Sequence, residues 1–220
     1  MKTIIIAPHP DDETIGAGGT LLRRKAEGGS IAWVIVTSLT AGQYWSEQQV
    51  VKRSEEIKKV AEFYEFDSVF ELKFPSTRLD EVAMGDLISA FSEVFNSFLP
   101  EEVFVPNRSD VHTDHRVVFD AAVSCTKWFR YPSVSRVLSY ETLSETDFGL
   151  NRSHQFNPNL FVNISPYIED KCRAMKFFES EIGEFPFPRS CEAIRALATL
   201  RGAASGYTAA EAFEILRERV

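Results

Sequence analysis

Histidine and aspartate side chains crowd into one short segment near the start of the sequence. His9, Asp11 and Asp12 lie within the motif PHPDDE, which directly follows the apolar run of residues 2–7. Charged and ligating groups held this close in a rigid turn repel each other, and a divalent cation relieves that repulsion. His and Asp are ligand types that zinc accepts. The segment therefore predicts a metal site.

A second segment of similar composition follows another apolar run. Residues 103–105 are apolar and stop at Pro106, and His112, Asp114 and His115 come shortly afterwards. Three of the four histidines thus lie in two turns of one kind. One catalytic zinc needs about three protein ligands and an open position for water, so the two segments together offer more candidates than one ion requires. Helix capping and turn formation would explain either segment alone, but they explain both together poorly.

The elements around these turns favour an α/β protein. The run at residues 2–7 is unbroken and rich in β-branched residues, which indicates a buried strand, and the prolines after it end that strand. Further strands are predicted at residues 30–37, 68–72, 102–105, 136–141 and 160–164. Helices are predicted at residues 14–25, 48–64, 79–99, 113–128, 190–204 and 208–219, with another that Ser165 caps.

This alternation predicts a Rossmann-like, mostly parallel sheet with helices on both faces, followed by C-terminal strands and helices. We expect residues 1–220 to form a single domain, because that length suits one hydrophobic core. Ligands in such folds bind at the carboxyl ends of the strands, where both turns lie. The glycines of residues 16–19 do not complete a G-x-G-x-x-G motif, so close helix packing is favoured over a nucleotide site.

Composition excludes several classes of protein. The formal net charge of −8 argues against a nucleic-acid binder, and no basic run contradicts that. The three cysteines form no C-x-x-C motif, which is typical of buried thiols in a reducing compartment. No signal peptide and no run long enough to span a bilayer is predicted. We therefore expect a cytoplasmic enzyme without stable membrane insertion.

The PHPDDE motif and the downstream H-x-D-H of residues 112–115 resemble the zinc-dependent PIG-L/LmbE-like de-N-acetylases. This family includes N-acetylglucosaminyl-phosphatidylinositol deacetylases and the deacetylases of mycothiol and bacillithiol pathways. The resemblance implies one Zn²⁺ per chain, held by His9, Asp12 and His115. It also implies that Arg53, in the stretch RSEE, contacts the substrate. A weaker likeness continues through residues 201–213.

Within that resemblance the remaining polar groups take roles. Asp11 is predicted to be the general base for a zinc-bound water, whose pKa zinc lowers to about neutrality. A protonated His112 would stabilise the oxyanion, and Asp114 would hold His112 in the right tautomer. Either Asp11 or His112 could protonate the leaving amine. Weaker candidates for outer contacts to the ligands are Glu13, Asn107 and Asp110.

The implied substrate is a small N-acetylated molecule, an N-acetylglucosamine-type sugar or sugar conjugate that loses its acetyl group by hydrolysis. Tyr44 and Trp45 could stack on a sugar face or equally cap the core, and His154 is interpreted as a solvated loop residue outside the site. Two alternatives remain: a metal-dependent hydrolase of another bond, such as a phosphoester or another amide, and a non-catalytic metal-binding domain. The sequence leaves open Fe²⁺ in place of zinc, and a homo-oligomer.

Overall fold

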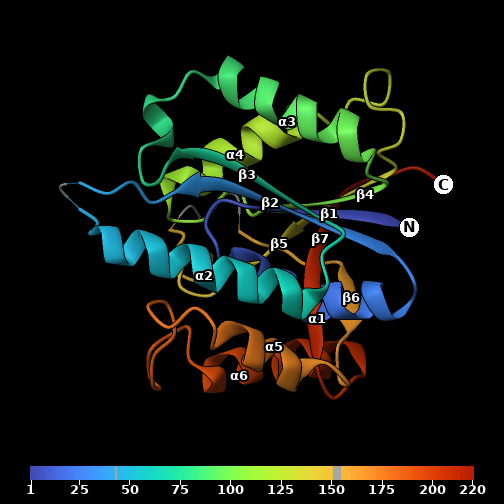
Figure 1. Ribbon diagram of the computed structural model, residues 1–220. Helices are drawn as coiled ribbons and strands as arrows, with labels where there is room; N and C mark the ends of the chain where they lie inside the picture. Colours follow the sequence, from blue (N-terminus) through green and yellow to red (C-terminus); the bar gives the residue numbers. More distant parts are fainter. Residues whose placement is uncertain (43, 151–154) are drawn as a thin grey trace.

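The computed structural model describes residues 1–42, 44–150 and 155–220, and a seven-stranded sheet runs through its centre in the order β3-β2-β1-β4-β5-β7-β6 (Figure 1). The strands are β1 (Lys2–Ala7), β2 (Ser30–Ser38), β3 (Ser68–Pro75), β4 (Glu102–Pro106), β5 (Arg136–Tyr140), β6 (Leu160–Asn163) and β7 (Ala210–Glu218). The first five in chain order pair in parallel, and β7 runs antiparallel to β5 and β6. The predicted α/β class with a mostly parallel sheet is confirmed.

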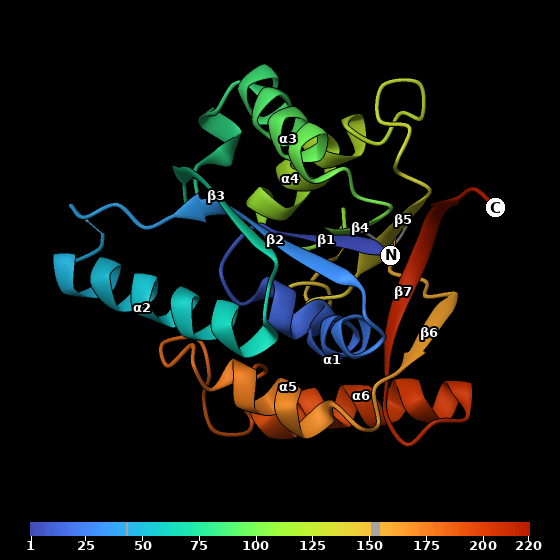
Figure 2. The same cartoon turned by 45° about the vertical axis from the view of Figure 1, so that its right-hand side comes forward.

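Helices cover both faces of the sheet, as Figures 1 and 2 show. They are α1 (Asp12–Ala26), α2 (Glu47–Tyr64), α3 (Met84–Phe98), α4 (Thr113–Ser124), α5 (Ile168–Met175) and α6 (Cys191–Ser205), with a short 3₁₀ turn at Leu79–Glu81. Alternate residues of β1 enter opposite cores: Ile4 and Ile6 pack with α3 and α4, whereas Ile5 packs with α1 and α2. Strands buried on both faces read as continuous apolar runs, which is why β1 was visible in the sequence.

The order of the strands places the two polar turns side by side. β1 pairs with β2 on one edge and with β4 on the other, so Ile5 lies between Trp33 and Phe104. The chain runs outward from β1 to β3 and then returns to β4, which makes the gap between β1 and β4 a topological switch point. The turns that follow these two strands meet there, where open α/β sheets bind ligands.

The glycines at the start of α1 serve close packing. A Cβ on Gly16 would lie 2.2 Å from the ring of Tyr140, and one on Gly19 would lie 2.7 Å from Ile164. The helix is therefore held tightly between the sheet and α5, as the packing interpretation expected (Figure 2). None of the described helices is long and apolar enough to cross a membrane.

The prediction of a helix at residues 208–219 is wrong, because this segment forms β7. Its composition, AEAFEILRE, favours a helix by intrinsic propensity. In the fold, however, its backbone hydrogen-bonds to β5 on one side and β6 on the other. Pairing on both edges outweighs a propensity of a few tenths of a kcal/mol per residue.

Three helix boundaries also differ from the predictions. α3 begins at Met84 rather than at residue 79, because the preceding residues form the 3₁₀ turn. α4 ends at Ser124 and is capped by His112 rather than by Thr113. α5 starts at Ile168, and the Ser165 hydroxyl is engaged by Asn163 and Ala209 instead of capping it. His154 lies outside the described residues.

A buried ion pair fastens β7 to the helical layer. Lys171 Nζ lies 2.6 Å from Glu211 Oε1 and also donates to the Ile15 carbonyl. The Glu211 carboxylate accepts the backbone N–H groups of Gly19 and Thr20 as well. A buried pair of this kind is specific in geometry, and removing one partner leaves the other charge buried without its counter-ion.

We expect Lys171→Met to lower the free energy of unfolding by about 3 kcal/mol, because the Glu211 carboxylate then remains buried with backbone donors alone. Urea denaturation measures this change. The matched control is Lys52→Met, which removes an exposed pair with Glu179 and should change stability little. Equal effects of the two substitutions would show that the buried pair does not anchor β7.

Candidate active site

The turn after β1 is held in an uncommon backbone conformation. Asp11 has φ 137°, a region that side chains other than glycine rarely adopt. The fully buried Glu13 fixes it, because Glu13 Oε2 accepts the Asp11 N–H at 3.0 Å. Thr14 and Ile15 donate their N–H groups to the Asp11 carbonyl and start α1. Glu13 was a weak candidate for an outer contact; its carboxylate clamps the backbone that carries Asp11.

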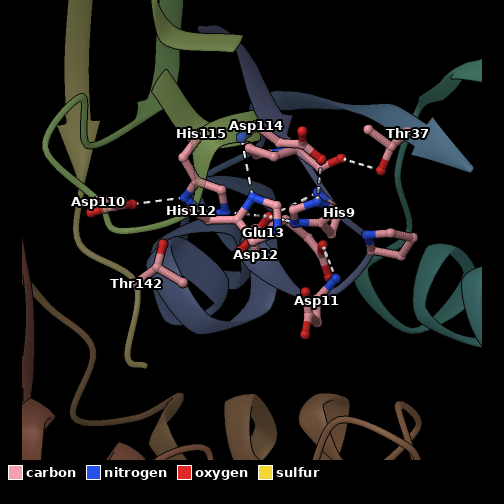
Figure 3. A network of polar contacts seen from close by, with 12 residues as sticks. His9, Asp11, Asp12, Glu13, Thr37, Asp110, His112, Asp114, His115 and Thr142 are labelled. Carbon is pink, nitrogen blue, oxygen red and sulfur yellow. Dashed lines mark hydrogen bonds and ion pairs between the residues drawn. The ribbon is translucent and has the colours of Figure 1, made fainter. Parts of the chain in front are cut away.

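Three side chains that could bind a metal ion converge at the carboxyl ends of β1 and β4 (Figure 3). Asp12 Oδ2 lies 3.4 Å from His9 Nδ1 and 3.3 Å from His115 Nε2. Two ligands that each bind a zinc ion at about 2.0–2.1 Å in tetrahedral geometry lie about 3.3–3.4 Å apart. His115 Nε2 is buried and has no hydrogen-bond partner among the described residues. The predicted ligands His9, Asp12 and His115 therefore fit a single divalent ion.

Each histidine of this trio is oriented by a second carboxylate. Asp110 Oδ2 lies 2.7 Å from His115 Nδ1, and Asp114 Oδ2 lies 2.9 Å from His9 Nε2. Such carboxylate–histidine pairs fix the tautomer and present the other ring nitrogen to a metal. The expected pairing of Asp114 with His112 is not the one found. The Asp114 carboxylate also accepts the backbone N–H groups of Thr77 and Leu79, and among the described residues no hydrogen bond joins it to the His112 ring.

The electrostatics of the trio favour a cation. Although burial lowers the pKa of His9, its hydrogen bonds to Asp114 and Asp12 raise that pKa to about 9. Burial also lowers the pKa of His115. The charge of Asp12 and the hydrogen bond to Asp110 outweigh this effect and raise that pKa well above its ordinary value. Despite its own burial, Asp12 has a lowered pKa because of His115 and His9. Either protons on the two rings or a divalent ion can balance these carboxylates.

The surroundings of His112 disfavour the protonated form expected from the sequence. Burial, together with the nearby His9 and His115, lowers the pKa of His112 to about 4. Its Nδ1 accepts the backbone N–H of Asp114 at 3.1 Å, which leaves the proton on Nε2. The ring lines the pocket described below. The signal missed in the sequence was the helix-cap position of His112, which supplies this backbone donor.

A second ion at this site is poorly supported among the described residues. His9, His112 and Asp114 also lie close together. The Asp114 carboxylate, however, already accepts three hydrogen bonds, and His9 belongs to the first trio. Two-metal hydrolases need a second full set of ligands, so the arrangement suits one ion.

His9 and Asp12 line a cavity of about 500 Å³, and His115 lies buried behind them. This volume is typical of sites for small molecules. Asp11 lines it beside the trio, and burial and the Asp12 charge raise the pKa of Asp11 to about 7, partly offset by Arg189. Arg189 Nη1 lies 3.2 Å from Asp11 Oδ2 and 3.3 Å from Glu181. Sequence reasoning missed Arg189 and Glu181, because they follow α5 in a segment without a recognisable motif.

Arg53, which the resemblance assigns to substrate contact, lines the same cavity, and its guanidinium is engaged by protein groups. It donates to the Pro10 carbonyl at 3.0 Å and to Ser180, and it pairs with Glu181. A chain of alternating charges thus connects Arg53 to the carboxylate of Asp11. Of the two loop aromatics, Trp45 lines the cavity, whereas Tyr44 is exposed and lies outside the lining.

A Rossmann-like sheet with a two-histidine, one-aspartate cluster beside a buried aspartate at its switch point is the architecture of a metal-assisted hydrolase. The sequence matches the GlcNAc-PI de-N-acetylase (PIG-L) family over residues 4–126, and the chain belongs to that family. The matched region contains both metal turns and Arg53.

Individual relatives agree with this assignment. Diacetylchitobiose deacetylase of Thermococcus kodakarensis is 27% identical over 220 residues, covering 96% of this chain and 81% of that protein. A conserved protein of Thermus thermophilus has a solved structure with a TM-score of 0.79 at 26% identity, covering 99% of this chain and 96% of its own. The inhibitor complex of N,N'-diacetylchitobiose deacetylase from Pyrococcus horikoshii shares the fold, with a TM-score of 0.80 at 21% identity over 98% of this chain and 84% of its own. The predicted family and the predicted enzyme class, a deacetylase that hydrolyses amide bonds, are confirmed.

We expect Asp110→Asn to weaken metal binding by about 10- to 100-fold. Asp110 accepts from Asn107 and Thr146 through Oδ1 and faces His115 through Oδ2, so an amide must turn its NH₂ group toward one of these partners. Facing His115, that group forces the wrong tautomer on the ring. Competition with a chelator of known affinity measures the change. Asp120→Asn, which alters an exposed pair with Arg108, should leave metal affinity as it was; an equal loss there would refute the role of Asp110.

Proposed function

We propose that the protein removes the N-acetyl group from an N-acetylglucosamine-type sugar or sugar conjugate, with a zinc ion held by His9, Asp12 and His115. The observation that carries this proposal is the convergence of His9, Asp12 and His115 next to the buried Asp11 carboxylate, where His9, Asp11 and Asp12 line one cavity. Membership of the de-N-acetylase family and the deacetylase activity of the Thermococcus relative support the choice of bond and substrate class.

Water adds to the carbonyl carbon of the acetamide, the C–N bond breaks, and acetate and a free amine leave. A zinc ion bound by these ligands supplies a Lewis acid that makes water more acidic and polarises the carbonyl. A mixed nitrogen and oxygen ligand set suits zinc, and also Fe²⁺.

Asp11 is the general base of this proposal. Its carboxylate is buried beside the trio, and a pKa of about 7 matches a group that must accept a proton near neutral pH. Arg189 contacts one oxygen, Oδ2, which restrains the carboxylate while the other oxygen remains for the water. The strained backbone at Asp11 is consistent with a role in the reaction, since such strain is concentrated at functional sites.

His112 stabilises the developing negative charge on the carbonyl oxygen by donating Nε2–H. A neutral imidazole with its proton fixed on Nε2 is a suitable donor, and removing one such donor typically slows a reaction by about 100- to 1,000-fold. The lowered pKa of His112 disfavours a protonated imidazole, so we assign the delivery of a proton to the amine to Asp11. Asp11 therefore returns the proton that it accepted to the leaving nitrogen. Asp114 contributes by orienting His9, and Arg53 by shaping the substrate wall of the cavity.

Incubation of the zinc-loaded protein with N-acetylglucosamine, N,N'-diacetylchitobiose and N-acetylglucosamine conjugates tests the proposal. We expect equal amounts of free amine and acetate from at least one of them, lost on treatment with a chelator and restored by added Zn²⁺. Parallel incubation with a phosphoester such as p-nitrophenyl phosphate tests the alternative bond. Phosphate release without any amine release would overturn the proposed function.

The two adjacent aspartates should separate chemistry from metal binding. We expect Asp11→Asn to retain the ion but to lower kcat by about 100- to 10,000-fold, because the base is lost while shape is kept. Asp12→Ala should lose metal and activity together, since two histidines alone hold zinc poorly. Metal content measured beside kcat distinguishes the variants. An empty Asp11→Asn site with a filled Asp12→Ala site would mean that the two roles are exchanged.

A further inference from the structure

The turn that follows β5 brings three polar residues to the wall of the cavity. Thr142, Ser144 and Glu145 all line the cavity. Thr142 is 1% exposed, and Figure 3 shows it on the side of the metal cluster where Asp110 and His115 lie. None of these residues belongs to either metal turn, and the family match ends before them.

Hydrogen bonds connect this turn to Asp110, the carboxylate that contacts His115. The Thr142 carbonyl accepts the N–H groups of Glu145 and Thr146, and the Thr146 hydroxyl accepts the Thr142 N–H. The same hydroxyl donates to Asp110 Oδ1 at 2.6 Å, on the carboxylate that orients His115. Ser144 takes the left-handed conformation at φ 74°, which costs energy for a residue other than glycine. Such a rigid turn can hold side chains in a defined position relative to the metal.

Two buried oxygens on this turn have no partner. Thr142 Oγ1 and Glu145 Oε2 are both enclosed and form no hydrogen bond within the described residues. Burying an unpaired hydroxyl or carboxylate oxygen costs about 1–3 kcal/mol or more. Native proteins retain such groups mainly where a ligand, an ion or water completes them. The neighbouring Thr146 hydroxyl and Asp110 carboxylate, by contrast, have hydrogen-bond partners, and both residues with an unpaired oxygen line the cavity.

An ion does not account for these two atoms. Glu145 lies close enough to His115, Asp12 and His9 for their charges to affect its pKa, which burial raises. Yet among the described residues Glu145 joins no group of metal-ligating atoms, whereas the trio does. Both open atoms accept hydrogen bonds, and Thr142 can also donate one. A ligand that completes both atoms would offer O–H or N–H donors next to the metal trio.

We propose that Thr142 and Glu145 form a hydroxyl-binding subsite that orients the sugar ring of the substrate. This inference rests on the proposed function. With the acetamide at the metal trio, the groups within reach are those on the ring carbons beside the acetamido carbon. In an acetamido hexose these carbons carry the 1- and 3-hydroxyls, of which the 3-hydroxyl stays free in a glycoside. The Glu145 carboxylate accepts a hydrogen bond from that hydroxyl, and the Thr142 hydroxyl makes a hydrogen bond with the same oxygen or with the neighbouring hydroxyl.

Kinetics of zinc-loaded Glu145→Ala, Glu145→Gln and Thr142→Val on N-acetylglucosamine test the subsite. We expect Glu145→Ala to raise KM by about 10- to 100-fold with a smaller change in kcat, as loss of a hydrogen bond to a charged group predicts. Glu145→Gln, which keeps an acceptor, should lose less. Metal content should be unchanged in all three, and a loss of metal from Glu145→Gln would overturn the assignment. Glu93→Ala, an exposed carboxylate of α3, is the matched control.

Deoxy sugars make the test specific to the hydroxyl. In the Asp11→Asn background, calorimetry gives dissociation constants for N-acetylglucosamine and its 1-deoxy, 3-deoxy and 6-deoxy forms. We expect the Asp11→Asn variant to bind the 1- or 3-deoxy sugar more weakly than N-acetylglucosamine. The double variant Asp11→Asn/Glu145→Ala should bind that deoxy sugar and N-acetylglucosamine equally. Loss of the distant 6-hydroxyl should change the dissociation constant by the same factor in both variants. The subsite is refuted, and the proposed function is not, if the loss of affinity for each deoxy sugar is the same with and without Glu145→Ala while the wild type still deacetylates sugars. If the wild type neither binds nor deacetylates them, the proposed function fails and the subsite with it.

Discussion

The carboxylates of Asp12, Asp110 and Asp114 lie buried around two imidazoles, and the rest of the site depends on how their charge is balanced. In a low dielectric, unpaired carboxylates are costly, so each one must face a cation or several N–H donors. His9 and His115 each contact these carboxylates through both ring nitrogens. One nitrogen of each ring faces an outer carboxylate, and the other faces Asp12. The same requirement that holds the rings in place thereby prepares a cation site between them.

The backbone supports this arrangement at little cost, because both turns end strands that pair with each other. β1 and β4 are adjacent, so His9 and His115 meet although they are far apart in the sequence. Where the backbone is strained, at Asp11, the buried Glu13 carboxylate and the first turn of α1 restrain it. Asp11 is therefore held next to Asp12 without sharing its direction. Two neighbouring aspartates can then differ in pKa, one lowered by histidines and one raised by burial.

The sequence was sufficient to predict the elements with strong periodicity and to bring His9, Asp12 and His115 together as one candidate cluster. Buried strands such as β1 are visible as apolar runs, and the resemblance to the family pointed to these three residues. It was insufficient for β7, where pairing with two strands overrides a helix-favouring composition. It was also insufficient for contacts that depend on tertiary placement. The carboxylate of Asp114 is two residues from His112, yet it turns to His9 because Thr77 and Leu79 present their N–H groups there.

The placement of residues along the chain separates reaction chemistry from substrate recognition. His9, Asp11, Asp12 and His115 lie in the region that matches the family, residues 4–126. The cavity walls beyond that region come from the turn after β5 and from the loop that carries Arg189. A hydrolytic centre tolerates few substitutions because its groups must balance each other's charge. Thr142 and Glu145 belong to neither of the two groups of potential metal ligands, so the turn after β5 can change with the substrate. A family that keeps one reaction while changing its sugar would vary these later segments most.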